Sequence, residues 1–398
     1  MNLPSKAFQV ELDTAKAWLF EAALPLWSDK GVDQKHGGFF ERMTPHGEML
    51  DDPRRTRLVA RQIYAFATGR ALGWKEPAAD IVQHGLDFFT RKCLSPDGGV
   101  YSSVQPNGVV IIGTFDLYDH AFALFALAAA AKAQPEHAKA HEAATLTLLD
   151  HMEHGFKHPA GGFEEALPRT LPLKANPHMH ILEAALTWSD TGDCARWKAL
   201  AAEIVDLCLS RFINPVTGAL HEFLDGDWRL LLAPPDDVVE PGHLFEWSWL
   251  LTRWGLAEGD DRALMAGRRM FELAETHGLC PATGLAVNEL DGALRVRDGR
   301  FRLWPQTERL KAQVAQYRLA SSAAEKAAAL DKITEALRLM RRYFEHPVQG
   351  SWWEHFGPDG RPHDEPARAS SLYHIVCAIA EVDDLRLEMG VIPGPALA

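Results

Sequence analysis

The stretch GGFFERMTPHGE (residues 37–48) decides the fold, because variants of it recur along the chain. The other copies are GGVYSSVQPNG (98–108), GGFEEALP (161–168), TGALHEFLDGD (217–227), TGLAVNELDGA (283–293) and GSWWEHFGPDG (350–360). Most combine glycine, a short run of apolar residues mixed with polar ones, and a second turn with Gly, Asn, Asp or Pro. This composition predicts a short β-hairpin loop in each copy. Successive copies begin 61, 63, 56, 66 and 67 residues apart, which indicates a six-fold repeat.

The segments between the hairpins have the periodicity of helices. Residues 55–72 place apolar side chains at i, i+3, i+4 and i+7. Residues 119–133 are apolar on all sides, which is typical of an enclosed helix, whereas residues 325–344 have a charged face. Six such pairs predict an all-α fold, an (α/α)6 barrel (toroid) with short β-hairpin loops at the mouth of its cavity. An open helical solenoid is the alternative. No linker rich in Pro or Ser divides the chain, so residues 1–398 are expected to form a single domain.

Composition narrows the range of partners and compartments. The net charge of −13 argues against nucleic acid and anionic membranes as partners. The five cysteines lie far apart and form no CxxC pair, a pattern that favours reduced thiols. The first 20 residues lack the apolar core of a signal peptide, and no uncharged apolar stretch reaches the roughly 18 residues of a membrane span. We therefore expect a cytoplasmic protein, a monomer or homodimer, whose partner is a small molecule.

One polar residue per repeat lies near the start of each predicted inner helix. These residues, separated by 59, 60, 63, 65 and 66 positions, are Arg61, His120, His180, His243, Glu308 and His374. In a six-fold barrel a shared phase means a shared height, so the side chains are expected to converge at one mouth of the cavity. Most lie in apolar helical sequence, where a buried polar group without a partner costs several kcal/mol. Such a group of histidines, with an arginine and a glutamate, suits proton transfer near neutral pH.

Other interpretations of these residues stay open. A lone histidine on an apolar helix is more often a hydrogen-bonded core residue, which is an equal alternative for His120. Arg61 could pair with Asp116 or Asp119, and Glu308 could merely orient a histidine. The chain has no GxxxxGK[ST] loop, no strand-linked GxGxxG and no HExxH helix, so no nucleotide cofactor and no metal is predicted. No dedicated phosphate site is recognised either.

At these residues the chain resembles the N-acylglucosamine 2-epimerase superfamily, over essentially its whole length. The resemblance rests on RLVARQ (57–62), NPHMHILEA (176–184), EPGHLFEW (240–247), WPQTE (304–308) and ARASSLYHI (367–375). It implies an (α/α)6 barrel and chemistry that needs no metal or cofactor. The positions that match the family's pocket are Arg61, Asn176, His180, His243, Glu246, Glu308 and His374. The form SSLYHI is most similar to the mannose isomerase, or aldose–ketose isomerase, branch.

These inferences predict a sugar isomerase that interconverts a mannose-like aldohexose and its ketose through a cis-enediolate. His243 and His374, which match the family's proton-transferring pair, would act as acid and base, and Arg61 would stabilise the enediolate oxygen. Glu246 and Glu308 would orient the histidines and raise their basicity. The residues expected to bind the sugar are Asn176, His180, Tyr118, His120 and Trp304.

Other functions stay open at this point. One is a sugar 2-epimerase, in which the proton returns to the other face of C2, and another is a mannose-6-phosphate isomerase. A third is an (α/α)6 glycoside hydrolase, which would need two opposed carboxylates, drawn from Asp116 or Asp119 with Glu308. A sugar-binding protein without catalytic activity is the non-enzymatic alternative.

Overall fold

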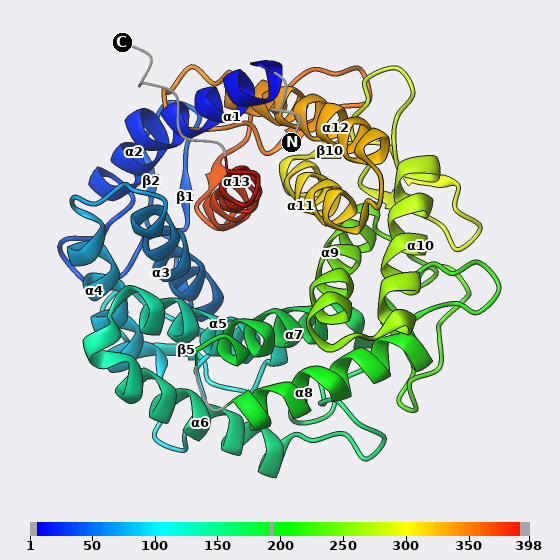
Figure 1. The fold of residues 1–398 in the computed structure, drawn as a ribbon. Coiled ribbons are helices and arrows are strands. Elements are labelled where there is room, and N and C mark those ends of the chain that lie inside the picture. The colour runs from blue at the N-terminus through cyan, green and yellow to red at the C-terminus, as the bar shows by residue number, and fades with distance from the viewer. Residues whose placement is uncertain (1–5, 192–193, 391–398) are drawn as a thin grey trace.

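The alternation of enclosed and amphipathic helices produces two concentric rings (Figure 1). The computed structural model describes residues 6–191 and 194–390. The inner ring consists of α3 (Thr56–Ala71), α5 (Leu117–Ala133), α7 (Ala175–Ser189), α9 (Pro241–Glu258), α11 (Leu303–Leu319) and α13 (Ser371–Glu388). The outer ring consists of α1 (Lys6–Trp18) with α2 (Leu24–Asp29), α4 (Ala78–Phe88), α6 (Ala138–Gly155), α8 (Cys194–Leu207), α10 (Asp261–His277) and α12 (Ala323–Arg341). Since α13 packs against α3, the ring is closed, and the predicted (α/α)6 barrel is confirmed.

The sequence of each helix explains its place in the barrel. Helix α5 is buried without interruption from Asp119 to Ala131, as its alanine-rich, apolar sequence predicts. Helix α12 buries one stripe that includes Ile333 and Leu337 and exposes most of its charged residues. Shorter helical turns follow or connect the helices: η1 (Leu19–Ala23), η2 (Phe89–Cys93), η3 (Pro135–His137), η4 (Cys208–Phe212) and η5 (Arg342–Phe344).

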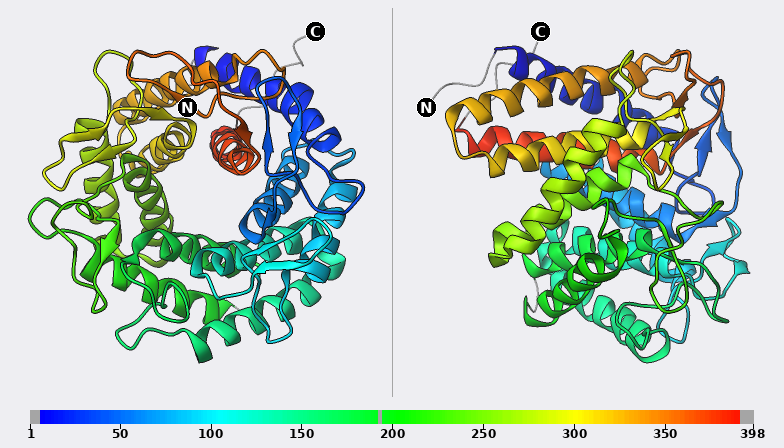
Figure 2. Two further views of the ribbon diagram at one scale, coloured as in Figure 1. Left: turned by 180° about the vertical axis from the view of Figure 1, so that it is seen from behind. Right: turned by 90° about the vertical axis from the view of Figure 1, so that its right-hand side faces the viewer.

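Very short strands gather at one end of the barrel (Figure 2, right-hand view). They are β1 (Arg42–Met43), β2 (Met49–Leu50), β3 (Arg54–Arg55), β4 (Ser103–Val104), β5 (Val110–Ile112), β6 (Leu173–Lys174), β7 (Phe223–Leu224), β8 (Glu289–Leu290), β9 (Val296–Asp298), β10 (Phe301–Arg302), β11 (His355–Phe356) and β12 (Ala367–Arg368). The predicted hairpins form as β1–β2, β4–β5 and β8–β9. In the copies at 217–227 and 350–360 a single bridge replaces the second strand. The copy at 161–168 forms only single bridges, from Phe163 to the nearby Lys157 and from Ala166 to Asp116.

Each repeat is joined to the next by backbone hydrogen bonds at this end. The segment before an inner helix pairs with the following hairpin: β3 with β4, β6 with β7, β10 with β11, and β12 with β1. Single bridges, Asp116 to Ala166 and Val239 to Leu290, complete the circle. The residue after each segment donates its N–H to the next hairpin, over 2.9–3.1 Å, in the pairs Thr56–Ser102, Leu117–Glu165, Ala175–Glu222, Leu303–Glu354 and Ala369–Glu41. Pro241, the first residue of α9 and at the equivalent place, has no N–H to give. Positions along all six inner helices therefore share one register when they are counted from this place.

The barrel closes between its first and last helices. Helix α1 packs on both α12 and α13, so it is the outer partner of an inner helix at the other end of the chain. The Lys16 ammonium lies 2.9 Å from the Asp383 carboxylate, and the Trp18 ring stacks on Phe344 with centroids 3.7 Å apart. This closure is non-covalent throughout.

Two general expectations concern the whole chain. Within residues 6–191 and 194–390, no helix combines the length and the hydropathy needed to cross a membrane. The cysteines whose side chains are described are free thiols, and three of them, Cys93, Cys208 and Cys377, are buried.

A substitution in α1 tests whether this closure stabilises the barrel. Leu12 is fully buried, so Leu12→Ala should lower the free energy of unfolding by about 2–5 kcal/mol through lost apolar burial and a cavity. Val10 lies on the same helix and is 46% exposed, so Val10→Ala is the matched control and should change stability by under about 0.5 kcal/mol. Tryptophan fluorescence during denaturant unfolding measures both values. Equal, small effects would show that α1 does not contribute to barrel stability.

Candidate active site

A cavity of about 770 Å³ opens at the hairpin end of the barrel. Because the six repeats share one register, equivalent residues lie at the same depth in the cavity. We count these levels from the residue that precedes each N–H donor described above, such as the residue before Thr56. The rim residues are Arg55, Asp116, Lys174, Glu240, Arg302 and Arg368. Two residues further along are the wall residues, Arg57, Tyr118, Asn176, Gly242, Trp304 and Ser370. Six residues beyond the rim are the floor residues, Arg61, Phe122, His180, Glu246, Glu308 and His374.

The equal phase predicted for six polar residues holds for four of them. Arg61, His180, Glu308 and His374 occupy the floor level, and all but Glu308 line the cavity directly. At the same level the other two repeats carry Phe122 and Glu246 rather than the predicted histidines. The sequence alone does not reveal this two- or three-residue offset, because the loops differ in length and the separation between successive repeats varies by several residues.

His120 lies outside the cavity lining. Its Nδ1–H donates to the Asp116 carbonyl over 2.8 Å, and its Nε2 accepts the Val100 N–H over 3.2 Å. His178 of α7 makes the same two kinds of backbone contact, with Lys174 and Phe163. His120 is thus a hydrogen-bonded core residue, and this geometry gives no support to its predicted contact with the sugar.

His243 lines the cavity three residues beyond the rim. Its Nδ1 lies 2.9 Å from the Glu222 carboxylate and 3.7 Å from that of Glu240. Burial alone would lower the pKa of His243, but these two carboxylates outweigh it and raise the pKa to about 10. His243 is therefore an imidazolium at neutral pH, and its Nε2–H is left to donate. The carboxylate beside it is Glu222, whereas Glu246, predicted to orient a histidine, lies on the floor beside Lys311.

His374 has the opposite electrostatic surroundings. Burial lowers its pKa well below the usual value, and the charges of Arg61 and Lys311 lower it further. Its Nδ1 lies 2.8 Å from Glu308, as the predicted orienting role requires. Burial raises the pKa of Glu308 to about 7, against the effect of Lys311. With Nδ1–H directed to Glu308, the Nε2 lone pair of His374 is free to accept a proton.

A buried charge network supports the floor. The Lys311 ammonium lies 2.5 Å from the Glu308 carboxylate and 3.7 Å from that of Glu246, and all three side chains are almost fully buried. Beside it, Glu183 pairs with His180 over 3.2 Å and accepts the Tyr373 hydroxyl over 2.6 Å. Burial opposes ionisation of Glu183, but His180 and Lys311 lower its pKa to about 2. Of the groups behind the two histidines, Glu183 is therefore held as a carboxylate, whereas the charge of Glu308 reflects the balance between burial and Lys311.

Sequence analysis did not single out Lys311, Glu183, Tyr373 or Glu222. The sequence contains a signal for Glu222, because a polar residue recurs at the equivalent position of every hairpin copy. These residues are Glu41, Ser102, Glu165, Glu222, Asn288 and Glu354. Glu41, Glu165 and Glu354 accept the backbone N–H of the rim residue in their own repeat, over 2.7–2.8 Å. Glu222 pairs instead with His243, so this glutamate contacts a cavity residue where its equivalents bind the backbone.

Arg61 of the floor and Tyr118 and Asn176 of the wall line the cavity together with these histidines. The Arg61 guanidinium donates to the Tyr118 hydroxyl over 2.6 Å and lies 4.1 Å from the Phe122 ring centroid. It makes no ion pair with Asp116 or Asp119 in the described structure. Asp119 faces Arg57, and Asp116 caps α5. The Asn176 Oδ1 is buried with no hydrogen-bond partner within the described ranges, as is the Arg61 Nε. A polyhydroxylated ligand would satisfy such atoms.

Trp304 stands next to both catalytic candidates. Its ring centroid is 4.9 Å from that of His243 and 5.9 Å from that of His374. Gly242, at the same level of the neighbouring repeat, makes this position available. A Cβ atom on Gly242 would come within 2.4 Å of the indole. The aromatic face of Trp304 and the two imidazoles therefore meet at one place on the cavity wall.

Two groups of side chains bring three metal-ligating atoms within 4.8 Å of one another: His180 with Glu183 and Glu246, and His243 with Glu222 and Glu240. In both, the carboxylates already balance a histidine or lysine charge. A divalent cation would have to replace those protons.

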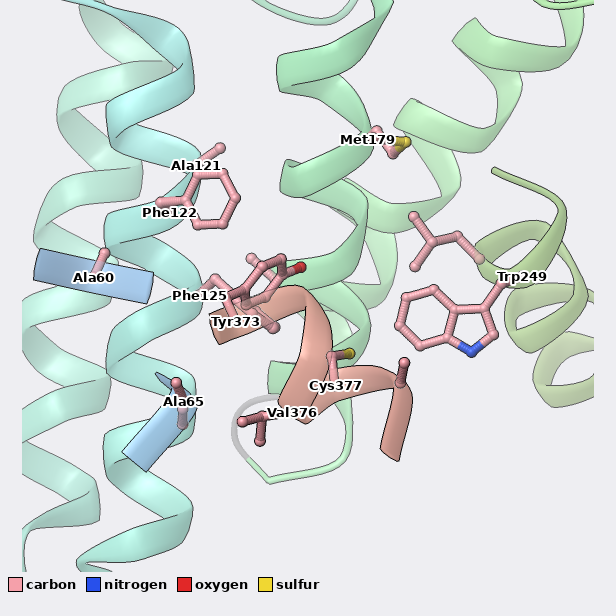
Figure 3. Packing of buried hydrophobic residues seen from close by; sticks show 14 of the residues in the cluster. Ala60, Ala65, Ala121, Phe122, Phe125, Met179, Trp249, Tyr373, Val376 and Cys377 are labelled. Atoms are coloured by element: carbon pink, nitrogen blue, oxygen red, sulfur yellow. The ribbon is translucent and has the colours of Figure 1, made fainter. Parts of the chain in front are cut away.

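A second cavity, of about 730 Å³, opens at the opposite end of the barrel. Phe125, Trp249 and Cys377 line this second cavity, and Figure 3 shows their side chains with that of Tyr373 among the inner helices. Among the residues described, the two linings have no member in common. The candidate site is therefore a pocket with a floor rather than a channel through the barrel.

Comparisons with known proteins identify the family to which the chain belongs. Residues 38–378 match the family model described as N-acylglucosamine 2-epimerase (GlcNAc 2-epimerase). A protein of Rhizobium meliloti (strain 1021) named mannose-6-phosphate isomerase is 41% identical over 369 residues, covering 92% of this chain and 95% of that protein. A cellobiose 2-epimerase of Bacteroides fragilis is 26% identical over 362 residues, covering 85% and 88%. The solved structure of a D-mannose isomerase superposes with a TM-score of 0.84 at 18% identity, covering 96% of this chain and 100% of that one.

The last similarity shows the fold alone, because its identity is low. The family model, however, spans most of the chain, and the Rhizobium meliloti protein aligns along nearly all of it. The chain therefore belongs to the N-acylglucosamine 2-epimerase family.

Proposed function

We propose that the enzyme interconverts a mannose-type aldohexose and its 2-ketose through a cis-enediolate. Membership of the family, with relatives named as sugar isomerases and epimerases, makes it an enzyme of the isomerase class that acts on sugars. The observation that carries the specific proposal is the pair of histidines beside Trp304. His243 is held as an acid and His374 as a base, within reach of one aromatic face.

The opposite charge states of the histidines assign their roles. The neutral Nε2 of His374 removes the proton from C2 of the open-chain aldose while His243 donates a proton to the C1 oxygen, which gives the enediol. In the second step His243 takes the proton of the C2 hydroxyl, and His374 returns its proton to C1, which gives the ketose. Both histidines end in the states in which they began, so no outside acid or base is consumed.

Three further groups complete the proposed site. Arg61 stabilises the negative charge that develops on the enediolate oxygen, since its guanidinium faces the cavity and keeps one N–H unpaired. Asn176 and His180 bind sugar hydroxyls, and Trp304 covers the apolar face of the sugar. Glu222 and Glu308 act through the histidines and are positioning residues. The chain folds as one unit in this proposal, because the site draws on all parts of the ring.

Epimerisation at C2 is the second candidate, and one observation favours it. Two imidazoles on different helices are what proton transfer at both faces of C2 requires, whereas a single base suffices for aldose–ketose isomerisation. Hydrolysis has weaker support, because Asp116 and Asp119 are engaged in an N-cap and an ion pair. The position to which the proton returns, C1 or C2, distinguishes the first two reactions.

Substitution of each histidine tests the mechanism. His243→Ala and His374→Ala should each lower turnover by about 10²–10⁴-fold, because each removes a proton-transfer group, while sugar affinity changes far less. In deuterated water, NMR of mannose, glucose, fructose and their 6-phosphates should show C2 exchange persisting in His243→Ala and lost in His374→Ala. The exposed His154→Ala is the control and should resemble the wild type. Near-normal turnover in both cavity variants would refute the mechanism.

Glu222 provides a test by pH dependence. Activity needs neutral His374 and protonated His243, so kcat/KM should fall on the acid side only well below pH 6.5 and on the alkaline side near pH 10. Glu222→Gln removes a carboxylate that raises the pKa of His243, so His243 loses its proton at lower pH. The alkaline limb should move down by about one pH unit or more, with the acid limb unchanged. The surface variant Glu272→Gln is the matched control. An unmoved alkaline limb would remove His243 from the acid role.

Chelation tests the proton-transfer chemistry against a metal-dependent one. We expect full activity after exhaustive treatment with EDTA, because the imidazolium of His243 has no lone pair for a cation and Lys311 already opposes the carboxylate charge of the other cluster. Activity is measured before chelation, after it, and after addition of single divalent metals. Loss of activity with recovery by one metal would contradict the expectation.

A further inference from the structure

The arginines of the cavity differ in whether they have a partner. Those that line it are Arg42, Arg55, Arg57, Arg61, Arg302 and Arg368. The first four are engaged: Arg42 with Asp52, Arg55 with Glu41, Arg57 with Asp119 and Arg61 with Tyr118. The guanidinium groups of Arg302 and Arg368 have neither a hydrogen bond nor an ion pair to any described residue. Two half-buried guanidinium groups without a direct hydrogen-bonding partner are unusual in a cavity wall.

These two arginines occupy equivalent rim positions in neighbouring repeats. Arg302 ends β10 and Arg368 ends β12, and α11 packs against α13 directly below them. Burial lowers the pKa of Arg302, the Glu240 carboxylate opposes that effect, and the positive charge of Arg368 adds to it, so the two arginines lie in each other's field. The carboxylates around them are occupied. Glu354 accepts Trp352, Ser371 and the Arg368 backbone, and Glu240 faces His243.

The geometry relates this pair to the reacting end of the sugar. Arg302 lies 5.6 Å from the Trp304 ring centroid, and Trp304 in turn adjoins His243 and His374. Arg368 is six residues before His374 on the same segment, at the rim above the floor. A sugar stacked on Trp304 with C1 and C2 at the histidines therefore directs its far end, C6, toward the two guanidinium groups.

We propose that Arg302 and Arg368 bind the phosphate of a hexose 6-phosphate, which makes phosphorylated sugars the preferred substrate class. The proposal rests on the isomerase function proposed above, because it takes the position of C1 and C2 from that function. Two planar guanidinium groups can each offer paired N–H donors to a phosphate that carries nearly two negative charges. Such a site uses side chains of two neighbouring repeats that lie 66 residues apart in the sequence, so it leaves no phosphate-loop motif.

Selectivity between phosphorylated and free sugar measures the proposal. We compare kcat/KM for mannose 6-phosphate and mannose in the wild type, Arg302→Ala, Arg368→Ala and the double variant. Each single substitution should lower the ratio of the two values by about 10- to 100-fold, mostly through a higher KM for the phosphosugar. Arg300→Ala is the matched control, because Arg300 lies two residues before Arg302 and pairs with Asp298 outside the cavity. Its ratio should equal that of the wild type.

Thermal stability, which can be measured without any reaction, tests the phosphate site separately from the isomerase function. Inorganic phosphate and mannose 6-phosphate should raise the Tm of the wild type and of Arg300→Ala, with a much smaller rise in Arg302→Ala and Arg368→Ala. If no sugar is isomerised but these shifts follow the pattern, the isomerase function fails and the phosphate site stands. If the variants lose mannose and mannose 6-phosphate activity equally, with unchanged phosphate shifts, the phosphate site is refuted and the isomerase function stands.

Discussion

One buried ammonium group sets the conditions for the whole site. Lys311 lies among carboxylates that are as deeply buried as it is, at 2.5 Å from Glu308 and 3.7 Å from Glu246. An isolated buried carboxylate would either take up a proton or destabilise the fold by several kcal/mol. Because Glu308 in turn holds Nδ1 of His374, the state of the proposed base depends on a lysine that never reaches the cavity. The chemistry at the floor is thus determined one layer below it.

The circle of backbone hydrogen bonds supplies the geometry in which these charges meet. It gives every inner helix the same starting point, so residues six positions beyond the rim face one another across the cavity although about sixty residues separate them in sequence. The rim, wall and floor then divide the work, with cations and hydrogen-bonding groups above and proton-transfer groups below. The fold alone does not specify this chemistry, since each level could carry other side chains on the same frame.

The sequence predicts the fold well because its signals are local and repeated. Hairpin turns and alternating helix types are visible in any one repeat, and six copies identify the closed barrel. The site is only partly predictable, because phase counted along a chain with loops of unequal length drifts by two or three residues. Because of that drift, the sequence analysis selected His120, whereas Phe122 occupies the floor level. His243 reached the cavity although it is not at the floor level, and the family resemblance rather than phase supplied Glu246. The contacts of Glu222, Lys311, Arg302 and Arg368 could not be read at all, since each depends on which repeat lies beside which in space.

The closure of the ring between α1 and α13 also has a consequence for synthesis of the protein on the ribosome. Contacts such as that between Lys16 and Asp383 join residues 367 positions apart. Helix α1 therefore cannot pack against α13 until α13 has been synthesised. Such long-range contacts form late in folding and leave apolar surface uncovered until then. His374 arrives on that last helix, so a nascent chain holds its proposed acid long before its proposed base. The packing of α13 therefore both closes the barrel and completes the proposed active site.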